Sequence, residues 1–243
     1  QRRGFSDEIV EQFGLGASPA AWDALTTHML AHGFAREHLE DAGLVVVKDD
    51  GRIFDRFRGR AMFTIRDASG RPVGFSARQL VEDPSSGKYI NSPQSLVFDK
   101  SRVLFGLDLA KRAIMENRAA HVVEGQADVI AMHQAGFTST VASSGTALTV
   151  DQMRLIKRYA DVAVLVFDGD AAGQTAMSKG IQIALQAGLD VHCVSLPAAE
   201  DPDSLLKGAG VEAMRDILAG AKPWLTWQAD RYRTQGDLDD PTR

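Results

Sequence analysis

The sequence predicts a mixed α/β protein in which a parallel sheet is flanked by helices. A basic α+β part precedes this sheet, and a short helical part follows it. Short apolar segments alternate with helical patterns between residues 121 and 195, which is typical of βαβ units. Earlier in the chain the pattern is instead that of short helices and a hairpin. After the alternating region comes a polar helical stretch.

The first elements predicted are short helices within residues 6–43. Ser6 and Ser18 are of the type that caps helix N-termini, and a proline follows Ser18 at what would be the first helical position. Gly33 and Gly43 are expected to end helices.

Three strands are predicted next: Leu44–Val47, Ala61–Ile65 and Val73–Ala77. The last two are expected to form a hairpin across Ser69 and Gly70. Residues 81–101 are rich in turn-forming residues and have no period, so they predict an ordered but irregular loop.

The alternating region then predicts strands at residues 121–124, Thr138–Ala142, Val162–Phe167 and Asp190–Ser195. Its helices are predicted at Ala127–Gln134, Val150–Tyr159 and Ala172–Gln186. A final helical stretch begins at Val211, and the last nine or so residues are polar, as in a frayed terminus or a linker.

Composition excludes several classes of protein. The 243 residues are 44% hydrophobic and carry a formal charge of −5, which is ordinary for a globular chain. The longest aliphatic or aromatic run, Val162–Phe167, is far shorter than the ~20 residues needed to cross a bilayer. No signal peptide opens the sequence. Cys193 is the only cysteine, which excludes disulfides and cysteine-rich zinc sites. We therefore expect a cytoplasmic protein without a membrane partner.

Charge is distributed unevenly along the chain. Residues 48–112 contain 13 Lys and Arg against 8 Asp and Glu, whereas residues 117–243 contain 11 against 16. A basic middle followed by an acidic half suits a protein that holds a polyanion beside a metal site. A chance offset between two solvated surfaces also explains the difference, and the charges alone leave both interpretations open.

Acidic residues follow the predicted parallel strands at their carboxyl ends, where such sheets place their sites. They are Glu124, Asp128, Asp168, Asp170, Asp201 and Asp203. Carboxylates brought together there repel one another unless a divalent cation neutralises them. Helix capping is the alternative explanation for any one of them. Because the set contains oxygen donors only, it predicts Mg²⁺ or Mn²⁺ rather than zinc, and such a site suits phosphoryl or nucleotidyl transfer.

The order of these acids resembles a known domain. Val123-Glu124-Gly125, then Asp168-Gly169-Asp170, then Asp201-Pro202-Asp203 resembles the Toprim domain of bacterial primases, topoisomerases and some nucleases. Flanking segments are similar to successive motifs of the DnaG-type primases, in order: Arg58-Gly59-Arg60-Ala61-Met62-Phe63, Gly74-Phe75-Ser76-Ala77-Arg78, Lys88-Tyr89-Ile90-Asn91-Ser92-Pro93, Phe98-Asp99-Lys100 and Ser144-Gly145-Thr146. The resemblance covers nearly the whole chain.

The sequence departs from that family at two places. Thr64 stands where the family usually has proline, and Gln126 where an aromatic residue is common. The family's zinc-binding and helicase-binding domains have no counterpart here, so we expect an excised catalytic fragment without zinc. We divide it into an N-terminal basic α+β subdomain (1–116), a Toprim α/β catalytic subdomain (117–208) and the start of a helical subdomain (209–243).

The resemblance implies roles for the acids. Glu124, Asp168 and Asp170 would be the catalytic residues and central metal ligands, with Asp128, Asp201 and Asp203 completing a Mg²⁺ or Mn²⁺ site. Glu124 as ligand and Glu124 as base are both left open.

The basic part of the chain supplies the residues expected to bind nucleotide or template: Arg58, Arg60, Arg78, Lys88, Tyr89, Asn91 and Lys100. Arg58 and Arg60 are two apart at a predicted strand start, so they are expected to share a face that grips phosphates. Solvated arginines with packed stems are the alternative for that pair. Tyr89 and Asn91 either contact a base or fix the loop. Ser144-Gly145-Thr146 is either a close approach to the site or a turn.

By the resemblance, the chain would make short RNA primers on a single-stranded DNA template from ribonucleoside triphosphates, at replication forks in the nucleoid. Replicative helicase and single-strand-binding protein would be partners through regions outside this sequence. Three alternatives are weighed: a Toprim topoisomerase or nuclease, a phosphatase with an Asp-x-Asp nucleophile, and a module that binds nucleic acid or nucleotide without chemistry.

Overall fold

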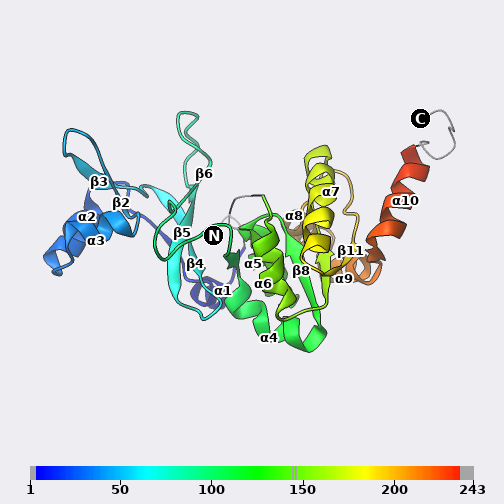
Figure 1. The fold of residues 1–243 in the computed structure, drawn as a ribbon. Coiled ribbons are helices and arrows are strands. Elements are labelled where there is room, and N and C mark those ends of the chain that lie inside the picture. Colours follow the sequence, from blue (N-terminus) through cyan, green and yellow to red (C-terminus); the bar gives the residue numbers. More distant parts are fainter. Residues whose placement is uncertain (1–3, 144, 146, 236–243) are drawn as a thin grey trace.

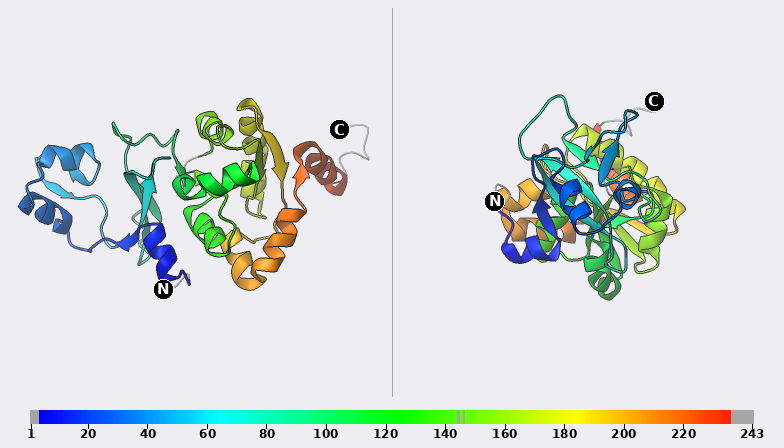
Figure 2. Two further views of the ribbon diagram at one scale, coloured as in Figure 1. Left: turned by 90° about the horizontal axis from the view of Figure 1, so that it is seen from below. Right: turned by 90° about the vertical axis from the view of Figure 1, so that its left-hand side faces the viewer.

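Three β-sheets follow one another along an elongated molecule in the computed structural model, which describes residues 4–143, 145 and 147–235 (Figure 1). A two-stranded sheet and two helices form one end, which we call the N-terminal tip (residues 24–55). A four-stranded sheet lies in the middle, and a six-stranded sheet with its helices makes up the rest. The left view of Figure 2 shows the same succession, with the last helix at the far end from the tip.

The elements of the first half are α1 (Asp7–Gln12), β1 (Leu15–Ala17), α2 (Ala24–Ala31), α3 (Arg36–Asp41), β2 (Val45–Val47), β3 (Ile53–Asp55), β4 (Arg60–Arg66), β5 (Pro72–Gln79) and β6 (Tyr89–Asn91). Strands β1, β4, β5 and β6 form an antiparallel sheet in that order, and β2 pairs with β3. The predicted hairpin is confirmed as β4–β5. Strand β6 lies inside the segment predicted to be an irregular loop, where it adds an edge to β5.

Local sequence explains where the short helices begin and end. Ser6 caps α1 by accepting a hydrogen bond from the backbone N–H of Ile9. Gly33 and Gly43 follow α2 and α3 with φ of +83° and +66°, as expected of helix-ending glycines. The prediction that Ser18 caps a helix is wrong. Its hydroxyl accepts from the backbone N–H of Arg60, which ties the chain after β1 to the start of β4.

The second half contains β7 (Leu104–Phe105), α4 (Leu107–Asn117), β8 (Ala119–Val123), α5 (Gln126–Gln134), β9 (Thr140–Ser143), α6 (Val150–Lys157), β10 (Val162–Leu165), α7 (Ala171–Gln186), β11 (Asp190–Cys193), α8 (Pro202–Gly208), α9 (Gly210–Ala219), β12 (Lys222–Pro223) and α10 (Trp224–Gln235). The strands run in the order β12-β11-β10-β8-β9-β7. The four central strands are parallel, and the two edge strands are antiparallel to them.

Strand order fixes where a ligand site can form. From β8 the chain crosses to β9 on one side, and it later returns to place β10 on the other side of β8. The crossover helix after β8 and the one before β10 lie on opposite faces of the sheet. The carboxyl ends of β8 and β10 therefore flank a topological switch point, the place where open α/β sheets bind ligands.

Two hydrophobic cores cover the two faces of this sheet. Leu165 and Val122 belong to the core that includes residues of α4, α6, α7 and α10. Val164 and Val123 belong to the core that includes residues of α1, β4, α5, α8 and α9. Because neighbouring residues of one strand are buried on opposite faces, the central strands are mostly apolar, as in other sheets covered on both sides. The predicted mixed α/β class is confirmed.

The predicted division at residues 116 and 208 stays a prediction, and edge strand β7 and helix α4 of the six-stranded sheet come before the first of these boundaries. Most of the polar segment predicted to fray, residues 236–243, lies outside the described part of the chain. Among the described residues, no helix has the length and apolar character needed to cross a membrane.

Candidate active site

Glu124 and Asp168 lie on either side of the switch point. Glu124 directly follows β8, and Asp168 comes three residues after the end of β10. The backbone N–H of Asp168 donates to Oε1 of Glu124 at 3.0 Å, so one carboxylate bridges the two neighbouring strand ends. The sequence-based expectation that these two acids meet at one edge agrees with this contact.

Glycines allow the loops beside Asp168 to pack closely. A Cβ on Gly169 would lie 2.0 Å from the carbonyl oxygen of Pro197, and a Cβ on Gly173 would lie 2.2 Å from the carbonyl oxygen of Asp168. The N–H of Gly169 also donates to the carbonyl of Glu200 at 3.0 Å. This packing joins the loop after β10 to the loop after β11 and brings the second group of acids to the same edge.

Three of the predicted acids cap helices. Asp170 accepts from the N–H of Gly173 at 2.7 Å at the start of α7, and Asp201 accepts from the N–H of Ser204 at 2.6 Å at the start of α8. Asp128, in the first turn of α5, accepts from the N–H of Gly125 at 3.1 Å. Each cap uses one carboxylate oxygen of the residue. The capping explanation and the ligand explanation therefore describe the same side chains and do not exclude each other.

Asp203 is held differently. It is 5% exposed, and its carboxylate pairs with the ammonium group of Lys207, one helical turn further along α8, at 2.7 Å. Lys207 was not among the predicted site residues. Its spacing of four residues from Asp203 within a helix is the sequence feature that indicates the pair.

Burial and mutual repulsion raise the pKa of two of these acids to about 7. For Asp168, loss of solvent is the main cause, followed by the charges of Glu124, Asp201 and Asp170. For Asp128, loss of solvent again dominates, and Asp201, Asp168 and Asp203 add to it. The charges that act on Asp168 and Asp128 come from all of the other predicted acids, so the six residues lie in one electrostatic environment.

The carboxylate oxygens at these strand ends are the donors that a divalent cation prefers, although they are not already arranged as a coordination shell. Within the described part of the chain, no three acidic, histidine or cysteine side chains are close enough to hold a metal ion together. Oδ1 of Asp168 is nevertheless buried and makes no hydrogen bond to a described residue. A buried carboxylate oxygen without a partner, in a set of mutually repelling oxygen donors, is what a hard cation would satisfy.

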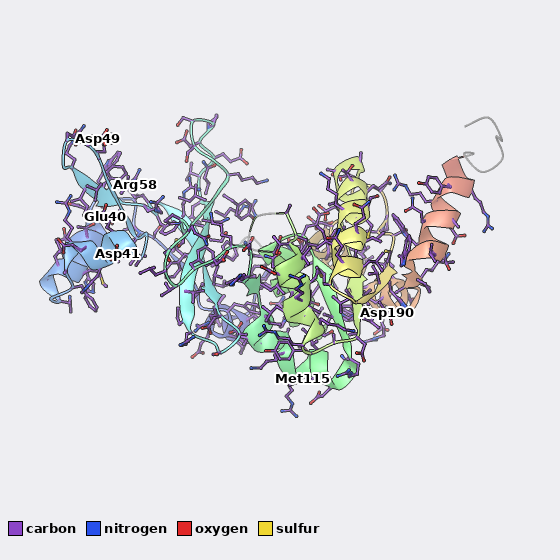
Figure 3. The ribbon with its side chains drawn as sticks, viewed as in Figure 1. Glu40, Asp41, Asp49, Arg58, Met115 and Asp190 are labelled. Atoms are coloured by element: carbon purple, nitrogen blue, oxygen red, sulfur yellow. The ribbon has the colours of Figure 1, made fainter. Side chains whose placement is uncertain are left out.

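Arg58 does not share a face with Arg60, so that expectation is wrong. Arg58 precedes β4, and its guanidinium lies over the ring of Trp22 at 4.1 Å and near that of Phe54 at 5.0 Å. It also donates to the carbonyl of Asp55. Figure 3 shows Arg58 beside the N-terminal tip, far from the six-stranded sheet. The aromatic partner Trp22 is 64% exposed.

Arg60 is buried, with 6% of its surface exposed, and its guanidinium binds the loop between β5 and β6. It donates to the carbonyl of Gly87 at 3.0 Å, to that of Lys88 at 3.4 Å and to the hydroxyl of Ser86 at 2.6 Å. These contacts commit its donors to the protein itself. A role for either arginine in phosphate binding stays a prediction.

The other predicted binding residues lie along β5, β6 and the loop that follows. Arg78 sits over the ring of Tyr89 at 5.7 Å, and Tyr89 is 38% exposed. Lys88 is exposed and Lys100 is half-buried. Asn91 approaches the six-stranded sheet, since a Cβ on Gly145 would lie 2.5 Å from its Nδ2. The close approach predicted for this glycine thus occurs toward Asn91, while its neighbours Ser144 and Thr146 lie outside the described residues.

A cavity of about 510 Å³ opens on the other side of Asp168, between α7, the end of β11 and α10. Gly169 and Gln174 line it from α7 and the loop before it, and Trp227 and Arg231 from α10. Solvent can therefore approach the loop of Asp168 from the side away from the basic sheet.

Comparison with protein families matches two parts of the chain. Residues 1–111 match the family described as "DNA primase catalytic core, N-terminal domain", and residues 121–206 match the family described as "Toprim-like". Primases with a Toprim-like domain generally use a divalent metal.

Individual proteins are similar over the same extent. A DNA primase of Synechococcus elongatus is 41% identical over 246 residues, which are 98% of this chain and 35% of that protein. The zinc-binding and RNA polymerase domains of Aquifex aeolicus primase superpose with a TM-score of 0.89 at 34% identity, covering 98% of this chain and 58% of that one. The DnaG primase catalytic domain bound to single-stranded DNA has a TM-score of 0.86 at 37% identity, covering 99% and 78%. The chain spans less than half the length of the curated relatives it matches.

Proposed function

The chain belongs to the family of bacterial DnaG-type DNA primases, of which it represents the catalytic core, and from this we propose that it synthesises RNA primers on single-stranded DNA. The reaction would be transfer of a ribonucleotide from a nucleoside triphosphate to the growing strand. One observation supports this most directly: mutually repelling carboxylates from adjacent parallel strand ends meet at the switch point of the sheet.

Glu124, Asp168 and Asp170 would hold the divalent metal, with Asp128, Asp201 and Asp203 around it. Mg²⁺ or Mn²⁺ is the proposed ion because all of the donors are carboxylate oxygens. When bound, it would neutralise the triphosphate and the leaving pyrophosphate. Water and the phosphates of the triphosphate would complete the coordination of the ion, as is usual for Mg²⁺.

The chain's own groups would then orient the reactants. The 3′-hydroxyl oxygen of the growing strand attacks the α-phosphorus in line, and the bond from that phosphorus to the bridging oxygen of pyrophosphate breaks. Glu124, at the end of β8, would either accept the hydroxyl proton or serve only as a ligand. Asp170 caps α7 and so fixes its carboxylate relative to the helix.

The basic sheet would hold the template and the triphosphate. The proposed contacts are Arg78, Lys88, Tyr89, Asn91 and Lys100, because Asn91 approaches Gly145 after β9, at the same end of the parallel strands as the acids. We call that end, which carries Glu124, Asp128, Asp168, Asp170, Asp201 and Asp203, the acidic edge. Arg58, stacked on Trp22, is proposed to contact the template further away. The related catalytic domain bound to single-stranded DNA supports a template of that kind. Helicase and single-strand-binding protein are proposed as partners of regions beyond this chain.

Labelled-ribonucleotide incorporation on single-stranded DNA with Mg²⁺ or Mn²⁺ tests the proposal. Asp168→Asn should reduce incorporation to background, because it removes a central carboxylate while keeping the shape of the side chain. Asp190→Asn is the matched control. Asp190 begins β11 at the opposite edge of the same sheet and is exposed (Figure 3), so this variant should keep wild-type activity.

A supplied RNA primer separates extension from initiation. If the wild type extends that primer and Asp168→Asn does not, the carboxylate site is catalytic. If Asp168→Asn retains full extension, the proposed site is wrong. If the wild type binds template yet never extends a primer, a binding module without chemistry becomes the better account.

A further inference from the structure

Gln126 occupies the first position of α5, two residues after Glu124 and two before Asp128. Its side chain is 5% exposed, so it is buried rather than solvated. At this position the resembling family commonly has an aromatic residue, which would fill a similar volume without an amide. The acids explain the metal but give no role to this glutamine.

The side-chain nitrogen of Gln126 makes no hydrogen bond to any described residue. An amide buried without a partner costs roughly 1–3 kcal/mol. Gln152 shows the usual alternative in the same chain. It is fully buried, and its amide donates to the carbonyls of Lys100 and Val103, both at 3.0 Å. The amide of Gln126 is therefore costly to the fold as it stands.

Its surroundings limit what could satisfy it. Glu124 and Asp128, each two residues away along the chain, carry carboxylates, and one oxygen of Asp128 already accepts from the N–H of Gly125. A lysine or arginine in this position would pair with those acids and cancel the charge that attracts a cation. A neutral amide leaves that charge in place and still offers two N–H donors.

We propose that Gln126 is a substrate-binding residue whose amide donates to an oxygen of the triphosphate chain of the incoming ribonucleotide. A phosphate oxygen near a divalent cation is the strong acceptor that such an edge would bring next to α5. The inference deepens the proposed function and rests on it, because it takes the nucleoside triphosphate as the ligand of the acidic edge.

Two variants of nearly the same size test this role. Gln126→Met removes the donors and keeps the volume, and Gln126→Glu replaces the NH₂ with a charged oxygen. In the metal-free protein Gln126→Met should raise the melting temperature, because an unsatisfied buried amide is replaced by an apolar chain. Gln152→Met is the matched control and should lower it, since that amide has two partners.

Nucleotide affinity should change in the opposite direction to stability. Titration with GTP in the presence of Mg²⁺ should show that Gln126→Met raises the Kd for GTP by about 10-fold or more. This is the loss of affinity expected when a hydrogen bond to a charged group is removed. Gln126→Glu should bind more weakly still. In primer extension, KM for ribonucleoside triphosphates should rise with kcat little changed, the pattern of an interaction made equally in the ground and transition states.

A lower melting temperature for Gln126→Met, like that of Gln152→Met, would show that the amide already has a partner in the fold and would overturn the inference. So would a higher melting temperature with unchanged GTP affinity. The titration does not depend on turnover. If the wild type fails to extend a supplied primer, the proposed function falls, and the titration still decides whether Gln126 binds the triphosphate.

Discussion

At the acidic edge, Asp168 and Asp128 are the residues whose ionisation the fold makes unfavourable. Their pKa values of about 7 lie far above the ordinary value of 3.8, so the fold favours their protonated forms. In the unfolded chain they ionise near pH 4. The metal-free protein should therefore lose stability as pH rises from about 4 to 7, and it should not regain it above that range.

This gives a prediction for metal binding. Millimolar Mg²⁺ should raise the melting temperature more at pH 8 than at pH 5, because only the ionised acids repel one another and attract the ion. Each kcal/mol corresponds to roughly 2–4 °C for a domain of this size. Asp168→Asn should show a smaller increment at pH 8. Equal increments at both pH values in the wild type would argue against a metal site formed by these residues.

Arg60 is expected to act on the fold before it acts on any ligand. Arg60→Ala removes the donors to the carbonyl of Gly87 and the hydroxyl of Ser86, and should cost roughly 1–3 kcal/mol in the free energy of unfolding. It should also speed proteolysis within residues 80–88. Arg71→Ala is the control, because Arg71 is exposed and pairs only at the surface. If both variants have the same melting temperature, the contacts of Arg60 do not stabilise the loop between β5 and β6.

At the scale of elements, close packing at Gly173 joins α7 to the site. Gly173→Ala would place a Cβ 2.2 Å from a backbone oxygen of Asp168, so either the helix or the loop has to move. We expect a loss of about 1–3 kcal/mol, together with loss of Mg²⁺-dependent stabilisation. Gly208→Ala, in α8, meets no atom within 4 Å and should change stability little. Similar melting temperatures for the two variants would contradict this.

The sequence predicted those elements whose pattern is local. The long helix Ala171–Gln186 and the apolar strand Val162–Leu165 were both anticipated within a few residues. Strands β1, β3, β6, β7 and β12 were not, because two or three residues rarely show a period and these segments lack the run of valines that marks β2. Helix α4 was also not predicted. It is followed by Arg118, which has a φ of +54°, and not by the glycine that usually marks a helix end.

The same contrast applies to the site. The acids could be placed because they follow strands whose apolar pattern is local. Arg58 could not, since its position depends on Trp22, 36 residues earlier in the chain. Gln126 was noted only as a departure from a family pattern, because the sequence does not show whether a buried amide has a partner.

For the molecule as a whole, the two hydrophobic cores of the six-stranded sheet do not extend into the N-terminal tip. Phe63 and Ile65 of β4 share a core with Val129 and Ile130 of α5, which ties the middle sheet to the six-stranded one. Among the described residues, neither core includes any from 24–55. Within the tip, Leu39 and Val45 are buried, and the carboxylate of Asp55 accepts from the N–H groups of Leu25 and Thr26 and from the Thr26 hydroxyl.

We therefore expect the tip to open before the rest of the chain unfolds. Native-state hydrogen exchange should show amides of residues 24–55 exchanging at a lower free energy than those of β8 and β10, as one cooperative unit. Asp55→Asn should lower that free energy further without changing exchange in β10. Uniform exchange energies across both regions would show that the tip and the sheets unfold together.

The stacking of Arg58 on Trp22 places a fluorescent side chain beside the tip, against Phe54 of β3. Trp22 is 64% exposed beneath a cationic group, whereas Trp227 is 8% exposed and its indole N–H is bonded to Ser195. A third tryptophan, Trp224, is half-buried in α10, so Trp224→Phe leaves two indoles that iodide, an anionic quencher, distinguishes by their exposure. The protein thus contains its own fluorophore at the end furthest from α10. Binding of a nucleic-acid template near Arg58 can be followed by the fluorescence of Trp22, without attaching a dye.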